Sequence, residues 1–82
     1  MADLSVLQTY YVLEGRLARR GFVDEAVGIL RDAAKEYPAY RISEEIQRLV
    51  RGKHGERYRY AYERFNELHM EIAGKPLPVH MV

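Results

Sequence analysis

The chain has 82 residues, which is enough for one domain with a thin hydrophobic core. Apolar residues make up 48% of it and charged residues 30%, as is typical of a folded globular protein. The net charge of +1 gives no strong global field for nucleic acid or an anionic membrane. The absence of cysteine excludes disulfides, thiolate metal sites and a cysteine nucleophile.

Apolar residues recur at helical spacing between residues 3 and 20, and this spacing predicts the first helix. Arg19 and Arg20 stand in its last turn, where cations favour the negative end of the helix dipole. Gly21 follows as a residue that can end the helix with a positive φ. Gly15 then lies inside the helix, where it should cost up to about 1 kcal/mol relative to alanine.

A second helix is predicted from Asp24, a typical N-cap, to Tyr37. Pro38 ends it, because the residue before a proline is pushed out of the α region. The turn between the first two helices is short, so we expect them to be antiparallel neighbours. Small and medium apolar residues form the core stripe of the second helix: Ala26, Val27, Leu30, Ala33, Ala34 and Tyr37.

The second half of the chain predicts two further helices. Ser43 is a typical N-cap for a third helix that reaches Arg51, and the "GKHG" stretch interrupts it. A fourth helix is expected from residue 56 to residue 73, with Gly74 as its C-terminal cap. Residues 1–74 are therefore expected to form one helical domain, followed by an irregular tail at residues 75–82.

Residues 8–40 resemble a tetratricopeptide repeat, a helix-turn-helix unit of about 34 residues. One departure is Glu14, which stands where the family has a small residue. The match is carried by an ordered set of residues at the spacing of the family: Tyr10, Leu13, Leu17, Gly21, Ala26, Leu30, Ala33 and Pro38.

Residues 41–74 are interpreted as a second, degenerate hairpin of the same kind. Ala61 and Phe65 align with the small and bulky positions of the first unit, but Glu45 and Arg48 stand where the first helix of the repeat should be apolar. The expected fold is therefore all-α, with four helices in two antiparallel helix-turn-helix hairpins. In the tetratricopeptide family, stacked repeats form a groove that binds a partner segment without catalysis, so the resemblance implies an interaction adaptor.

No pattern for catalysis or for a cofactor is found. The three histidines, His54, His69 and His80, are scattered, and the sequence has no metal-binding pair such as HExxH. His69 follows the apolar stripe of the fourth helix, and we interpret it as a partly buried packing residue. We therefore expect no catalytic residues, no metal and no cofactor.

The run "RGKHGERYRYAYERF" at residues 51–65 combines cations with aromatic rings. Three of its rings, Tyr58, Tyr62 and Phe65, fall on the core stripe of the fourth helix, whereas Tyr60 points away from it. A basic corner remains, and it could be a solvated turn, a surface for an acidic protein or, less favoured, a nucleic-acid site. We name its residues as a second candidate surface: Arg51, Lys53, Arg57, Arg59 and Tyr60.

The resemblance places the partner-binding groove on the exposed side of the first helix, at Gln8, Tyr11, Val12, Gly15 and Arg19. Apolar residues beyond the core stripes, among them Val23 and Leu77, predict either a homodimer or a partner helix. No membrane span is expected, and we expect a cytoplasmic protein. The predicted function is a non-catalytic protein–protein interaction adaptor, and the alternative is a small nucleic-acid-binding or regulatory helical protein that uses residues 48–60.

Overall fold

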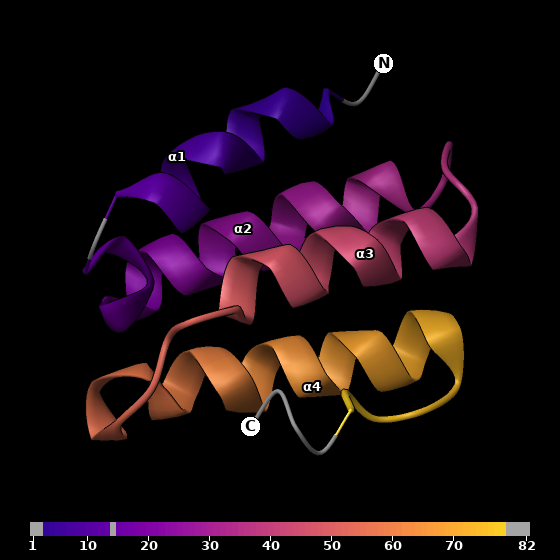
Figure 1. Cartoon of the computed structure of the whole chain (residues 1–82). Coiled ribbons are helices and arrows are strands. Elements are labelled where there is room, and N and C mark those ends of the chain that lie inside the picture. The colour runs from indigo at the N-terminus through magenta and orange to yellow at the C-terminus, as the bar shows by residue number, and fades with distance from the viewer. Residues whose placement is uncertain (1–2, 14, 79–82) are drawn as a thin grey trace.

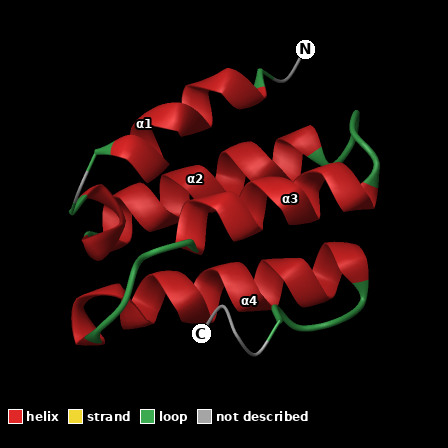
Figure 2. Ribbon diagram, viewed as in Figure 1, coloured by secondary structure: helices red, strands yellow, loops and turns green. Residues whose placement is uncertain are grey.

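Residues 3–13 and 15–78 are described by a computed structural model, and this part of the chain is all-α and has no strand, as predicted (Figures 1 and 2). None of its helices is long and apolar enough to span a membrane. Its elements, with 3-10 turns written η, are η1 (Leu4–Leu7), α1 (Gln8–Val12), η2 (Arg16–Ala18), α2 (Arg20–Ala33), α3 (Ala39–Val50), η3 (Glu56–Tyr58) and α4 (Arg59–Ala73).

The continuous first helix predicted for residues 3–20 is wrong. The α-helix ends at Val12, Leu13 is extended, and Gly15 takes the left-handed conformation with φ +86°. A continuous helix would put Leu13 and Leu17 on one face. The break instead leaves Leu13 47% exposed and turns Leu17 into the core. The glycine is therefore required by the backbone at this turn, rather than tolerated inside a helix.

The boundaries of the next two helices also differ from the prediction. Because α2 begins at Arg20, Gly21 lies in its first turn and does not end a helix, and Asp24 lies within the helix instead of capping it. Next, α3 begins directly after Pro38, whose carbonyl accepts hydrogen bonds from the amides of the first turn. Ser43 is therefore an interior residue of α3 and not its cap.

The last helix, α4, lies against both α2 and α3 (Figure 1), and its Phe65 is fully buried. It is antiparallel to α3, where the Tyr62 hydroxyl donates a hydrogen bond to the Val50 carbonyl at 2.9 Å. The core residues with 0% exposed surface are Leu7, Val23, Ala26, Leu30, Ala33, Ile42, Ile46, Leu49 and Phe65. The predicted stripe of α2 is confirmed at Ala26, Leu30 and Ala33, whereas the interpretation of Val23 as surplus surface is wrong.

His69 joins α4 to α3 and to the tail. Its Nε2 accepts a hydrogen bond from the Ser43 hydroxyl at 2.6 Å, and its Nδ1–H donates to the Lys75 carbonyl at 2.6 Å. The ring is 1% exposed, so the predicted packing histidine is also a fully buried hydrogen-bonding residue. Gly74 caps α4 with φ +76°, as predicted.

The first residues of the tail fold back onto the domain. The Leu77 amide donates to Asn66 Oδ1 at 2.8 Å, and the Leu77 side chain is 4% exposed. Leu77 therefore belongs to the core of its own chain and needs no partner to cover it. The expectations for residues 79–82, including His80, fall outside the described residues.

Replacing Gly15 by alanine is expected to lower the free energy of unfolding by about 1–2 kcal/mol, because a side chain at positive φ is strained. A Cβ there would also stand 3.0 Å from Arg57 Nη2. Gly28 is the matched control, because it lies inside α2 and an added Cβ would meet nothing within 4 Å. Gly28→Ala should be stabilising by up to about 1 kcal/mol. Urea denaturation measures both changes, and equal shifts in the two variants would contradict the account of Gly15.

Candidate interaction surface

The two surfaces predicted separately meet at one end of the helical bundle. The connecting residue is Arg57, which lines three adjoining hollows of about 350, 390 and 510 Å³. Arg57 shares the hollow of about 350 Å³ with Tyr11, Val12 and Lys53. It shares the hollow of about 510 Å³ with Gly15 and Arg19, among others. Most of the predicted groove and most of the predicted basic corner are therefore parts of one surface. The hollow of about 390 Å³ adds Arg59 and Tyr60.

Two of the predicted residues lie apart from this surface. Gln8 lines a hollow between α1 and α3, where the buried carboxylate of Glu45 lies 3.8 Å from both Arg41 and Arg48. Arg51 is exposed where α3 ends and lines none of these hollows. Tyr11 belongs to the hollow of Gln8 as well as to that of Lys53, so it marks the border between the two regions.

The cations of the chain fall into two classes. Six of the thirteen lysines and arginines lie within 4.0 Å of a carboxylate in the described residues: Arg31, Lys35, Arg41, Arg48, Arg59 and Arg64. Among the other seven, Lys75 lies in the tail. Arg51 lies apart from the hollows, and the remaining five come from two short segments. We call these five the basic end: Arg16, Arg19, Arg20, Lys53 and Arg57.

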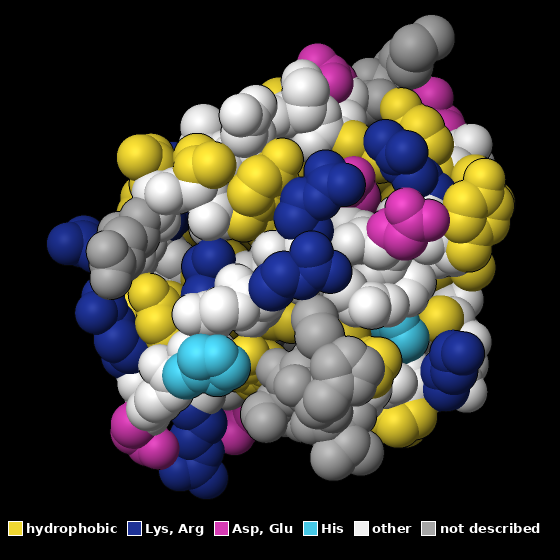
Figure 3. Space-filling view, in the orientation of Figure 1, with side chains coloured by type: hydrophobic (Ala, Val, Ile, Leu, Met, Phe, Trp, Pro, Cys, Tyr) yellow, Lys and Arg dark blue, Asp and Glu magenta, His cyan; other side chains and the backbone are white. Residues whose placement is uncertain are grey.

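The basic end lies where α2 and α4 begin. The turns η2 and η3 contact each other there, so residues 16–18 and 56–58 are close in space although far apart in sequence. Figure 3 shows Lys and Arg side chains along the left edge of the molecule, over these helix starts. Two apolar side chains border the basic end, because Val12 is 59% exposed and Leu13 is 47% exposed.

Arginines cover the aromatic rings at this end. The Arg20 guanidinium lies 4.7 Å from the centre of the Tyr60 ring, and Arg57 lies 5.1 Å from that of Tyr58. Arg16 lies over Phe22 at 4.6 Å. Such contacts between cations and rings are favourable and hold the guanidinium groups in place. The rings therefore position arginines and are not open faces.

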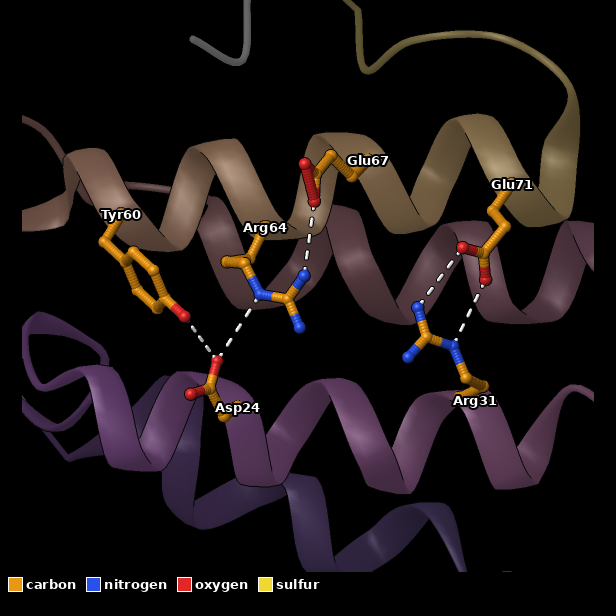
Figure 4. Close-up of polar contacts among 6 residues, drawn as sticks. All are labelled: Asp24, Arg31, Tyr60, Arg64, Glu67 and Glu71. Carbon is orange, nitrogen blue, oxygen red and sulfur yellow. Dashed lines mark hydrogen bonds and ion pairs between the residues drawn. The ribbon is translucent and has the colours of Figure 1, made fainter.

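Although the sequence places Tyr60 off the core stripe of the fourth helix, the residue has a structural role in the fold. Its hydroxyl donates a hydrogen bond to Asp24 Oδ1 at 2.6 Å, which ties α4 to α2 (Figure 4). This hydrogen bond to the carboxylate raises the pKa of Tyr60. Arg64 contacts the same carboxylate at 3.4 Å. Seven residues further along each of the two helices, Arg31 pairs with Glu71. These contacts show that α2 and α4 run parallel.

Two cations of the predicted corner, like Tyr60, have hydrogen-bond partners within the chain. Lys53 Nζ donates a hydrogen bond to the Tyr11 carbonyl at 3.3 Å, and burial lowers the pKa of Lys53. Arg59 lies 3.2 Å from both Glu56 and Glu63, and hydrogen bonds to these carboxylates raise its pKa. Its charge is locally neutralised, so Arg59 contributes less to the basic end than the sequence suggests.

Sequence reasoning missed Arg16 and Arg20, which it assigned to the interior and end of the first helix. The structure places Arg16 in η2, where it lines one hollow with Arg57, and Arg20 at the start of α2, over the Tyr60 ring. No group of three or more His, Asp or Glu side chains that could hold a metal is found within residues 3–13 and 15–78.

No family model, no curated protein and no solved structure matches this sequence. The resemblance to the tetratricopeptide repeat therefore stays a prediction that rests on the residues of the chain.

Tyr10 predicts a pH dependence of stability. Its ring is 3% exposed and its hydroxyl donates to the Glu25 carboxylate; burial and, next, this hydrogen bond raise its pKa to about 12. The unfolded chain ionises this tyrosine near its ordinary pKa of about 10. Its stabilising contribution is therefore complete below pH 10 and is lost as the pH rises from 10 to 12.

A Tyr10→Phe variant tests this account through the free energy of unfolding measured between pH 8 and pH 12. The difference between the wild type and the variant should fall by up to about 1.4 kcal/mol for each pH unit in that window. Since other tyrosines also titrate there, only the difference is informative. A constant difference from pH 10 to pH 12 would contradict the role of the Tyr10 hydroxyl.

Proposed function

We propose that the protein is a non-catalytic protein–protein interaction module that binds its partner at the basic end. The observation that carries the proposal is the segregation of charge. Five cations without a carboxylate partner in the described residues gather at one end of a chain whose net charge is only +1. Elsewhere in the fold, arginines are paired with carboxylates, as Arg31 is with Glu71.

Grouping like charges is unfavourable for the isolated chain, because they repel one another. An oppositely charged partner removes that repulsion and is attracted over a distance, which raises the rate of association. Val12 and Leu13 add exposed apolar area directly beside the charges. A cationic surface with an apolar border is suited to a protein partner that offers both kinds of contact.

The alternative of nucleic-acid binding is less well supported by the same surface. Proteins that bind single strands use open aromatic faces on which bases stack. Here Tyr60 and Tyr58 carry the guanidinium groups of Arg20 and Arg57.

A photo-crosslinking residue at position 12 tests the proposal in an extract of the native host. We expect a covalent adduct with a protein, lost when Arg57 is also changed to glutamate. The matched control is the same residue at position 35, which is exposed just beyond the other end of α2, roughly 20 Å away along the helix. Equal labelling at both positions, or adducts with nucleic acid only, would refute the proposal.

A further inference from the structure

We infer that the ligand of the basic end is an acidic protein segment with an apolar residue beside its carboxylates, held by arginines that aromatic rings fix in place. This inference rests on the proposed function and adds the chemistry of the partner. Three arginines carry it, because Arg16, Arg20 and Arg57 each lie over a ring and have no carboxylate within 4.0 Å in the described residues.

A guanidinium group that stacks on a ring keeps its N–H edges available. These edges form two parallel hydrogen bonds with a carboxylate, which a lysine cannot do. Since the ring already restricts the side chain, less conformational entropy is lost when the anion binds. Arg20 is the clearest example. Its guanidinium lies over the Tyr60 ring, and this ring is held in turn by the hydrogen bond from its hydroxyl to Asp24.

The hollows are arranged for an extended segment. Arg16 and Arg57 line one hollow, and Arg57 and Arg20 line the next, with Ala18 shared between the two. A strand-like segment that crosses both therefore meets the three arginines in sequence.

Exposed apolar side chains distinguish an acidic protein segment from a simple polyanion. Leu13 lines the hollow of Arg16 and Arg57, and Val12 lines the neighbouring hollow with Lys53. An apolar side chain placed between carboxylates would cover this border and remove apolar area from water. Phosphate groups alone cannot make that contact.

Fluorescence polarisation with a labelled synthetic peptide tests the ligand class on the full chain. The probe has about eight residues, with aspartate and glutamate around a central leucine, and spans roughly 26 Å when extended. We expect binding that weakens as salt is added. A version with asparagine and glutamine should not bind, and one with alanine for leucine should bind more weakly. Tighter binding of oligouridylate of equal charge would overturn the inference.

Two matched pairs of variants test how the arginines act. Arg57→Ala should weaken peptide binding about fivefold, whereas Arg31→Ala removes an equal charge from the Glu71 pair and should have little effect. Tyr60→Leu keeps every cation but removes the ring beneath Arg20, and it should weaken binding about two- to fivefold. Tyr60→Phe keeps the ring and should retain most of the affinity. Circular dichroism and thermal unfolding check that each variant is folded.

The possible results separate this inference from the proposed function. Equal affinities of folded Tyr60→Leu and Tyr60→Phe proteins would overturn the role of the ring. Failure of the acidic peptide to bind, together with a protein adduct at position 12, would reject the ligand class and leave the interaction module intact. If the acidic peptide does not bind and no protein adduct forms at position 12, both the ligand class and the proposed interaction module are rejected.

Discussion

The arrangement of the chain depends on α4, which must bury two faces at once. Phe65 lies at its centre without any exposed surface. On one side, His69 is bonded to Ser43 of α3; on the other, Tyr60 is bonded to Asp24 of α2. A helix held on two sides cannot slide along either neighbour without breaking contacts on the other. The start of α4 is thereby fixed against η2, and Arg57 comes to lie beside Gly15.

Periodicity was sufficient to predict the class of the fold and the core of α4, because apolar spacing reports which face a helix buries. It failed at helix boundaries, where tertiary contacts decide. Ser43 has the chemistry of an N-cap, yet its hydroxyl is used by His69 and α3 begins after Pro38. Likewise, the spacing of Leu13 and Leu17 fits a continuous helix, and only the conformation of Gly15 shows that the chain turns between them.

The candidate surface was predictable in its parts but not as a whole. Residues such as Val12 and Lys53 were named from the sequence, but their proximity depends on packing between distant segments. Arg16 was missed because it was placed inside a helix. A local signal existed: neither Arg16 nor Arg57 has an acidic residue three or four positions away, so neither can form the usual pair along a helix. Unpaired cations of this kind indicate a surface better than a simple count of charges.

The loop between α3 and α4 links the basic end to the resistance of the protein to proteolysis. Arg51 is exposed there, and Lys53 follows within the same turn. Exposed loops are preferred sites of proteolytic cleavage, and proteases that cut after basic residues would find their sites in this loop. A cut there would separate α4, with Phe65 and His69, from the helix that it covers. A partner that covers the basic end would therefore also shield the connection on which the fold depends.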